Sequence, residues 1–427
     1  MHVLFLSDNF PPEMNAPASR LHEHARRWVE AGHRVTVITC APNFPGGKVF
    51  EGYENRWCTR EEVDGIEVVR VKTFIVANRG FLLRTLDYLS FMVAAFVAGL
   101  FQNRPDVVVA TSPQFFAACG GWALAAVRRL PFVFELRDIW PASLEAVGAS
   151  KNRLLIRFFE RIELFLYRRA RAIIAVTRSF KEELVHRGID GDKIHVVTNG
   201  VDLTRYTPQQ RDPALAREMG VDGKFVVGYV GTHGMAHALD NCLAAAEQLR
   251  GRTNVHLLFV GDGAAREALL EQKERLRLDN VTLHPPMPKE QMPAIWGLCD
   301  VALVHLRDAP LFETVIPSKL FEAMGMGLPV VIACPEGEAT SIVRATGCGR
   351  VVAPEDPNAL ATCLEFLSKG PAMMRTLRER SLAAAPRYSR DQLAGEMMGH
   401  LLVAAGLPPE RTEERPHVAP PDRAAAA

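Results

Sequence analysis

The sequence predicts an α/β protein made of two doubly wound domains that face each other across a central cleft. Three observations lead to this fold class. Short apolar and β-branched runs alternate with helix-period segments through the first 200 residues, which is the rhythm of a parallel sheet covered by helices. The same rhythm restarts near residue 225, after a turn-rich stretch. A chain of 427 residues is also too long for a single hydrophobic core.

The predicted strands of the first half occupy residues 3–7, 34–39, 66–71, 107–111, 132–136, 173–176 and 194–197. The predicted helices between them include residues 19–31, 114–129 and 151–170. The predicted strands of the second half occupy residues 225–229, 255–260, 281–283, 301–304, 330–333 and 350–352. Because ligands of such sheets bind beyond the carboxyl ends of the strands, we expect the site in the cleft between the domains.

Turn residues and composition set the expected domain bounds. We predict an N-terminal domain at residues 1–200 and a C-terminal domain at residues 201–385, joined at the turn cluster Asn199-Gly200-Val201-Asp202. Residues 386–405 form a C-terminal helix that can pack back on the first domain. Residues 406–427 lack periodic hydrophobic residues, which is typical of a disordered tail.

Composition excludes several classes of protein. Hydrophobic residues make up 48% and charged residues 23%, as in a packed globular chain. The 50 Lys and Arg residues balance 49 acidic ones, so no global field recruits nucleic acid. Eight cysteines without a C-x-x-C pair predict buried thiols in a reducing cytoplasm. The alternating start of the chain does not resemble a signal peptide.

Two segments have the character of membrane-surface helices. Residues 81–101 are apolar, but Arg84 and Asp87 interrupt them, and the remaining run is shorter than the roughly 20 residues of a membrane span. Residues 151–171 combine leucine and phenylalanine with several arginines, as basic amphipathic helices do. For each segment, two interpretations remain: a helix that contacts the surface of a bilayer, or a helix that only packs on its own domain.

The most informative motif is TVIPSKLFEAMGMGLPVV at residues 314–331. It predicts a loop with Ser318 and Lys319 that leads into a short helix, and an apolar strand after it. A helix N-terminus with a serine and a lysine suits an anion such as a diphosphate. Glu322, one turn inside, suits a ribose diol, which one carboxylate can hold with two hydrogen bonds.

Glycine turns follow the first two predicted strands of the second half. Gly261, Asp262 and Gly263 follow residues 255–260, and a loop from Gly231 through Gly234 follows residues 225–229. Turns of this kind let a base or a phosphate approach the backbone. Each motif alone is equally typical of a plain tight turn.

The succession of motifs identifies a family resemblance. The order NGVD, GYVGTHG, FVGDGAAREALL, NVTLHPPMP, CDVALVHL and SKLFEAMGMGLPVV resembles the family 4 glycosyltransferases of the GT-B type, with two Rossmann-like domains, from residue 1 to about residue 405. The motifs DNFPPE, CAPNFP and RDIWP in the first half resemble O-antigen N-acetyl-L-fucosamine transferases and colanic-acid-type enzymes.

The resemblance implies a retaining glycosyltransferase that takes a sugar from a nucleotide diphosphate, with uridine as the expected base. The implied sugar is an N-acetylated hexosamine or deoxyhexosamine, and the implied acceptor is a saccharide on polyprenyl diphosphate. Such an enzyme serves surface polysaccharide synthesis, in the cytoplasm and peripheral on the inner membrane. Its implied partners are the nucleotide sugar, the lipid-linked acceptor and the membrane surface.

Expected donor-binding residues are Gly231, Gly234, His237, Gly261, Asp262, Gly263, Ser318, Lys319 and Glu322. Lys319 is also an expected catalytic residue, because the departing diphosphate gains negative charge. The expected group that orients or deprotonates the acceptor hydroxyl is Asp138, at the carboxyl end of residues 132–136, with Glu13 as a second candidate. For Asp138, an ion pair with Arg137 or a helix cap is the plain alternative.

Several positions depart from the family pattern, among them Asn15 and Ala16, which replace the usual glycine pair of the first N-terminal loop. Many members carry two glutamates seven residues apart; Glu322 is the second, and the position of the first holds Thr314. Thr232 and His237 stand where many members have an arginine and a lysine. Cationic binding of the diphosphate therefore falls chiefly on Lys319, with backbone N–H groups and His237 as helpers.

No metal and no cofactor are expected. The D-x-D pattern at Asp190 and Asp192 lies in a predicted turn, where a metal role is disfavoured. Two other classes stay open as alternatives: a nucleotide-sugar epimerase or hydrolase of the same fold, and a non-catalytic subunit that binds nucleotide sugar. A nicotinamide dehydrogenase is disfavoured because no G-x-G-x-x-G follows residues 3–7.

Overall fold

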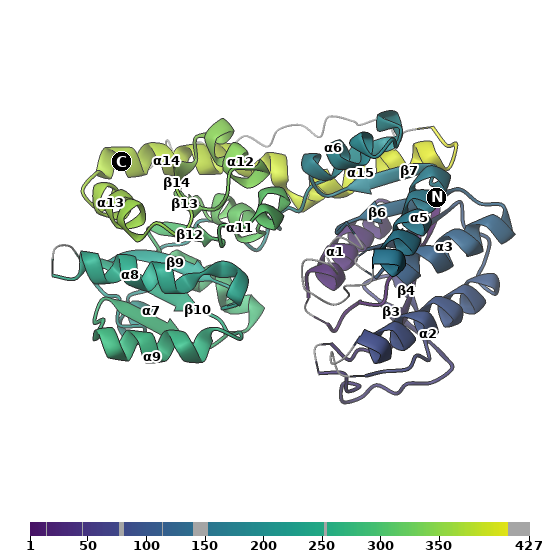
Figure 1. Ribbon diagram of the computed structural model, residues 1–427, viewed down its shortest axis with the longest axis horizontal. Coiled ribbons are helices and arrows are strands. Elements are labelled where there is room, and N and C mark those ends of the chain that lie inside the picture. Colours follow the sequence, from purple (N-terminus) through teal and green to yellow (C-terminus); the bar gives the residue numbers. More distant parts are fainter. Residues whose placement is uncertain are drawn as a thin grey trace, which may run out of the picture.

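The computed structural model describes residues 1–408 except 14, 45, 77–80, 113, 140–152 and 252–253. The predicted tail beyond residue 408, and Trp140 and Pro141 of the RDIWP motif, lie outside the described residues. The described chain forms two α/β domains that lie side by side (Figure 1). Each is built on one twisted sheet of mostly parallel strands.

The sheet of the first domain has eight strands in the order β3-β4-β2-β1-β5-β6-β7-β8. Its strands are β1 (His2–Leu6), β2 (Arg34–Cys40), β3 (Cys58–Val63), β4 (Ile66–Val71), β5 (Val107–Thr111), β6 (Phe132–Leu136), β7 (Ala172–Ala175) and β8 (Ile194–Val196). One face is covered by α1 (Ala16–Glu30) and α15 (Arg390–Ala404). The other face is covered by α2 (Phe81–Leu100), α3 (Phe115–Arg128), α5 (Arg153–Arg169) and α6 (Arg178–His186).

The sheet of the second domain has six parallel strands in the order β11-β10-β9-β12-β13-β14. They are β9 (Phe225–Val230), β10 (Val255–Val260), β11 (Val281–His284), β12 (Val301–His305), β13 (Val330–Ala333) and β14 (Gly349–Val352). One face packs against α8 (Leu239–Leu249), α9 (Arg266–Leu276), α13 (Pro357–Ser368) and α14 (Pro371–Ala384). The other packs against α7 (Pro213–Glu218), α10 (Met292–Gly297), α11 (Lys319–Gly325) and α12 (Glu338–Thr346).

Every predicted strand is present, and one strand was not predicted. β3 pairs antiparallel with β4 at the edge of the first sheet. Its side chains are alternately exposed and half-buried, so it carries no apolar run. Cys58 at its start is exposed, so the prediction that the cysteines are buried is wrong for this residue. Asp64 and Gly65, both at positive φ, form the two-residue turn of this hairpin.

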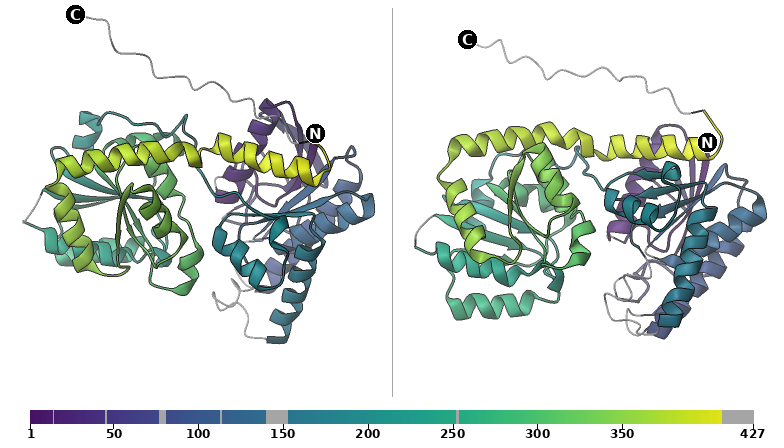
Figure 2. Two further views of the ribbon diagram at one scale, coloured as in Figure 1. Left: turned by 90° about the horizontal axis from the view of Figure 1, so that it is seen from above. Right: turned by 45° about the horizontal axis from the view of Figure 1, so that its top comes forward.

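The C-terminal helix returns to the first domain. α14 and α15 run one after the other along both domains (Figure 2). α15 packs on α1, where Leu393, Met397 and Leu401 are buried, and the indole of Trp28 donates a 2.8 Å hydrogen bond to the carbonyl of Ala394. The chain therefore crosses between the domains twice, and a β-bridge between Val201 and Ser389 joins the two crossings.

A buried arginine anchors the first crossing. The guanidinium of Arg20 on α1 pairs with Glu135 of β6 at 2.9 Å. It also donates to the carbonyls of Val197 at 2.9 Å and Thr198 at 2.7 Å. Arg20 and Glu135 are both almost wholly excluded from solvent. The end of the first domain is thus tied to α1 and β6 at once.

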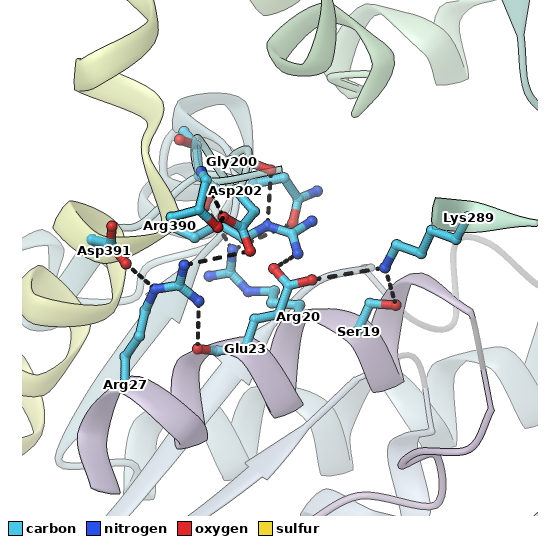
Figure 3. Close-up of polar contacts among 12 residues, drawn as sticks. Ser19, Arg20, Glu23, Arg27, Gly200, Asp202, Lys289, Arg390 and Asp391 are labelled. Atoms are coloured by element: carbon cyan, nitrogen blue, oxygen red, sulfur yellow. Dashed lines mark hydrogen bonds and ion pairs between the residues drawn. The ribbon is translucent and has the colours of Figure 1, made fainter. Parts of the chain in front are cut away.

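Ion pairs around α1 extend this anchor to the second crossing and to the second domain (Figure 3). Arg27 pairs with Asp391 at the start of α15 and with Asp202, which lies 3.7 Å away. Glu23 pairs with Arg390, and at 3.7 Å with Lys289 of the second domain. One face of α1 therefore holds both crossings and touches the opposite domain.

Helix α2 is less buried than a core helix. Its stretch Leu83–Leu100 is long and apolar enough to cross a membrane, by length and composition alone, and 17% of it is buried. A helix packed on a globular domain passes the same test. α2 packs on α3 through Phe91 and Ala95, whereas Leu86 and Val93 are 52% and 56% exposed. The alternative of a wholly buried core helix is therefore wrong.

We expect Arg20→Leu to lower the stability of the protein by about 3–5 kcal/mol, because it leaves the carboxylate of Glu135 buried without its partner. The midpoint of urea unfolding checks this. Arg26→Leu is the matched control, since Arg26 is a half-buried arginine on the same helix that pairs with Glu30 at 3.7 Å. The double variant Arg20→Leu/Glu135→Leu should recover much of the loss. A single variant as stable as the control would contradict the anchoring role of Arg20.

Candidate active site

Two glycine loops meet at the carboxyl ends of β9 and β10. A Cβ atom on Gly261 would lie 1.9 Å from the carbonyl oxygen of Gly231, and one on Gly263 would lie 2.6 Å from that of His233. The φ angles of Gly231, Gly261 and Gly263 are all between +136° and +154°. Only glycine fits this close approach. The loops are locked by the N–H of His233, which donates to the carbonyl of Asp262 at 2.8 Å.

Lys319 reaches this junction from the start of α11. Its amino group lies 3.5 Å from the centre of the Tyr229 ring, in a cation–π contact, and beside Gly231. The side chain is buried, and among the described residues its Nζ has no hydrogen-bond partner. Burial lowers the pKa of Lys319 to about 7, and the nearby Glu322 carboxylate opposes that shift. A buried amine with no partner is costly, and an anion placed here would both pair with it and restore its charge.

Two histidines of the loop after β9 flank the lysine. Burial and the charge of Lys319 lower the pKa of His237 to about 4, so the ring is neutral. Its Nδ1 lies 3.3 Å from the carbonyl oxygen of His305. His237 can therefore help bind an anion only as a neutral group. His233, which the sequence analysis did not select, is fully buried, and neither ring nitrogen has a partner among the described residues.

The expected ribose residue lies on the same helix as the lysine. The carboxylate of Glu322 accepts a 3.3 Å hydrogen bond from the indole of Trp296. Burial raises the pKa of Glu322, whereas Trp296 and the charge of Lys319 lower it. Helix α11 begins at Lys319, and the carbonyl of Ser318 already accepts from the N–H groups of Phe321 and Glu322. Because these backbone N–H groups are already used, an anion at this site would be bound mainly by side chains.

The remaining donor-site candidates have local roles. Gly234 opens a short 3-10 helix, and its carbonyl accepts from the N–H of His237 at 3.0 Å. Asp262 is exposed, and its Oδ1 accepts from the N–H of Gly263 at 2.8 Å. Thr314 lies in the 3-10 helix Pro310–Thr314, and its hydroxyl donates to the carbonyl of Leu311 at 3.2 Å.

Asp138 faces a cavity of about 520 Å³ between the two domains. On the side of the first domain it is lined by Asp138, Ile139 and α6, and on the other side by Leu311 and Thr314. Burial raises the pKa of Asp138, and the charge of Arg137 opposes the shift. The N–H of Asp138 donates to the hydroxyl of Ser112 at 3.0 Å, which fixes the loop. Its place in the cleft suits a group that receives a proton.

Glu13 lies in a different cavity, inside the first domain. Its Oε1 accepts from the N–H groups of Asn43 at 2.8 Å and Phe44 at 2.9 Å. Asp138 is not among the described residues that line this second cavity. The structure therefore does not bring the two candidate carboxylates into one pocket.

Within the described part of the chain, no group of three or more His, Cys, Asp or Glu residues is placed to hold a metal ion. Asp190, of the D-x-D pattern, caps a short 3-10 helix, and its carboxylate accepts from the N–H of Asp192 at 3.0 Å.

Comparisons with known proteins agree with this architecture. Residues 18–205 match the domain described as Glycosyltransferase Family 4, and residues 224–369 match Glycosyl transferases group 1. The chain is 25% identical over 398 residues to the putative colanic acid biosynthesis glycosyl transferase WcaI of Escherichia coli K12, which covers 90% of this chain and 96% of that protein. It is 27% identical over 421 residues to the GDP-mannose-dependent alpha-mannosyltransferase of Mycobacterium tuberculosis, covering 95% and 97% of the two chains.

Among solved structures, Anabaena HepE in complex with UDP-glucose superimposes with a TM-score of 0.70 at 20% identity, over 94% of this chain and 100% of that one. This likeness shows the GT-B fold. With both glycosyltransferase domains present in order on that fold, the chain belongs to the family 4 glycosyltransferases.

Proposed function

We propose that this glycosyltransferase moves a sugar from a uridine-diphosphate donor to a saccharide carried on polyprenyl diphosphate, in the synthesis of a surface polysaccharide. The sugar class we propose is an N-acetylated hexosamine or deoxyhexosamine, transferred with retention. The observation that carries the proposal is the buried, unpartnered amino group of Lys319 between the two glycine loops. An anion is the ligand that this arrangement lacks.

In the donor site, different residues bind the two ends of the nucleotide diphosphate. Lys319 meets the diphosphate, and the glycines at 231, 261 and 263 leave room for it against the backbone. Glu322 holds the ribose. HepE has been crystallised with UDP-glucose, whereas the mycobacterial relative is named for GDP-mannose. We propose uridine because HepE, which shares the fold of this chain, binds UDP-glucose.

The chemistry needs stabilisation of charge more than covalent help. As the glycosidic bond to the diphosphate breaks, negative charge grows on the leaving oxygen and positive charge on the sugar ring. Lys319, once charged, stabilises the leaving group, and we propose that no metal is required for this. Asp138, in the cleft between the domains, orients the acceptor hydroxyl and takes its proton.

The assay that tests the proposal combines purified protein, EDTA and UDP-N-acetylglucosamine or related UDP-sugars, with and without a polyprenyl-diphosphate-linked sugar. Release of UDP that depends on the acceptor, with a matching gain in acceptor mass, supports it. Release without the acceptor would indicate a hydrolase, and epimerised donor without release an epimerase. Donor binding without turnover would indicate a non-catalytic subunit.

We also propose that the enzyme is cytoplasmic and binds the inner membrane through α2 and α5. Both helices lie on the same side of the first sheet and contact α3 between them. The exposed large apolar residues of these two helices include Leu83, Leu86, Val93, Val97, Leu154 and Phe158. Arg157 and Arg161 are exposed on α5 beside them. Apolar contact with nearby arginines suits an anionic lipid surface.

Nucleotide binding should separate the roles of Glu322 and Lys319. Glu322→Gln should weaken uridine and uridine diphosphate alike, by about tenfold, because a hydrogen bond to a charged group is worth about 1.5–3 kcal/mol. Lys319→Met should weaken only the diphosphate. Glu313→Gln, on the neighbouring 3-10 helix, is the control. Calorimetry measures all four proteins, and equal losses for both ligands in Lys319→Met would place the lysine away from the phosphates.

The pKa of Lys319 adds a pH dependence with a definite sign. In the free protein the amine is charged below about pH 7 and loses its proton above it. Because the diphosphate binds the charged form, affinity should fall as the pH rises from 7 to 9. At pH 8, uridine diphosphate should bind with uptake of most of one proton, measured from calorimetry in buffers of different ionisation enthalpy. Lys319→Met should abolish the uptake and Glu322→Gln should keep it.

Asp138→Asn should slow sugar transfer by about a hundredfold while leaving donor affinity near normal, which is the scale of a positioned general base. Asparagine keeps the size of the side chain and the N–H bond to Ser112. Turnover at saturating donor and acceptor is the measurement. A rate near that of the unmodified enzyme would remove the assignment and make Glu13 the next carboxylate to test.

Membrane binding should depend on the exposed face of α2. The triple variant Leu86→Gln/Val93→Gln/Val97→Gln should lose affinity for anionic vesicles by about tenfold or more, since it removes apolar surface from the contact. Sedimentation with phosphatidylglycerol vesicles checks this. Val403→Gln on α15 is the control, because it is an exposed valine on the opposite side of the sheet. Equal sedimentation of both variants would contradict docking through α2.

A further inference from the structure

A second cavity, which contains Glu13, lies in the first domain. It has a volume of about 260 Å³ and lies at the carboxyl ends of β1, β2 and β5, where ligands of a parallel sheet bind. Asp8 and Glu13 line it from the loop after β1. Asp87 and Tyr88 line it from α2, and Gln114 from the loop after β5. The cavity therefore draws on three loops and a helix of the first domain.

Two polar groups in this cavity lack partners. Glu13 is 3% exposed; its Oε1 accepts from two loop N–H groups, and its Oε2 has no hydrogen-bond partner in the described part of the chain. Gln114 is 4% exposed; its Oε1 accepts from the N–H of Ala117 at 2.7 Å and caps α3, and its Nε2 has no partner there either. Leaving a buried polar group unpaired costs about 1–3 kcal/mol. One missing partner must donate a hydrogen bond and the other must accept one.

The charge of the cavity is mainly acidic. Three carboxyl groups, of Asp8, Glu13 and Asp87, line it together with one guanidinium, of Arg84. Burial raises the pKa of Asp8 to about 7 and that of Asp87 to about 6. Negative charge is thus already unfavourable here, and an anionic ligand would add to it.

We propose that this cavity holds the terminal sugar of the acceptor and selects a neutral or amino sugar over an acidic one. The inference rests on the proposed function and goes beyond it by naming the acceptor class. A sugar hydroxyl can donate to Glu13 and accept from Gln114, which meets both unpaired groups at once. The carboxylates repel a uronic acid or a phosphorylated sugar and favour an amine. Arg137 lies in Coulombic range of both Asp8 and Asp138, so this cavity and the one that Asp138 faces are neighbours.

The test uses matched octyl glycosides at pH 8 in the presence of uridine diphosphate. The neutral members are the glucoside, the galactoside and the N-acetylglucosaminide; the acidic members are the glucuronide and the galacturonide; the amine is the glucosaminide. We expect at least one neutral sugar to bind about tenfold more tightly than its uronic acid, and the amine to bind no more weakly than the glucoside. The shared octyl chain cancels any contribution from the apolar helices.

Two conservative variants assign the binding to this cavity. Glu13→Gln keeps an oxygen for the loop N–H groups and removes the carboxylate, and Gln114→Glu keeps the cap of α3 and removes the amide donor. Each should weaken the neutral sugar by about tenfold, whereas Glu62→Gln, an exposed carboxylate on β3, should change nothing. Asp87→Asn should reduce the difference in affinity between the neutral sugar and the corresponding uronic acid.

Equal affinity for the neutral and acidic members, no binding by any member, or unchanged binding in both variants would overturn the inference. In parallel, uridine diphosphate is titrated into the unmodified protein and into each variant in the absence of any sugar. Normal nucleotide affinity together with a failed sugar result overturns only the acceptor class. Loss of nucleotide binding in the unmodified protein overturns the proposed function itself.

Discussion

The buried pair of Arg20 and Glu135 is the interaction on which the arrangement of the two domains depends. It fixes α1 to β6, and the same guanidinium holds the carbonyls of Val197 and Thr198 as the chain leaves the first domain. The bridge between Val201 and Ser389 then ties the outgoing chain to the returning one. The two crossings of the chain between the domains are therefore joined to each other, and the first of them is anchored to α1 and β6.

A second contact between the domains joins α6 of the first domain to the start of α12. Glu338, at the start of α12 in the second domain, accepts from the N–H groups of Arg178 at 2.7 Å and Ser179 at 3.3 Å. A carboxylate at a helix N-terminus is favourable, so the second domain completes the start of α6. α6 also lines the cavity that Asp138 faces. The carboxylate of Glu338 therefore joins the second domain to a helix that lines the cavity next to the candidate base.

Much of the fold could be predicted from sequence because parallel strands buried on both faces are continuous apolar runs. Strand β3 was not predicted because both of its faces are partly exposed and it has no apolar run. The sequence Asp64-Gly65 is nevertheless typical of a hairpin turn and could have indicated it. Lys319 and Glu322 could be selected as candidate site residues because one short motif contains both. The loop that contains His233 was also selected, but its sequence does not indicate which of its histidines, His233 or His237, is the more buried.

The contacts of Arg20 could not be predicted, since its partner Thr198 is 178 residues away. The sequence likewise could not predict that Glu13 and Asp138 lie in separate cavities. Both residues follow strands of one sheet, and their order along the chain does not reveal that they line different cavities. Such facts depend on how loops pack after the sheet has formed, and a single sequence carries no local signal for them.

Each domain has a buried polar group that lacks a hydrogen-bond partner in the described part of the chain. In the second domain this group is the amine of Lys319, and in the first it is an oxygen of Glu13, in a cavity with other carboxyl groups. Transfer of a sugar separates charge in the same sense, with negative charge growing on the leaving diphosphate and positive charge on the ring. In the reaction that we propose, Lys319 gains its proton when the diphosphate binds and so supplies positive charge where the negative charge grows. In the empty protein the same amine can stay neutral, which limits the cost of keeping it buried.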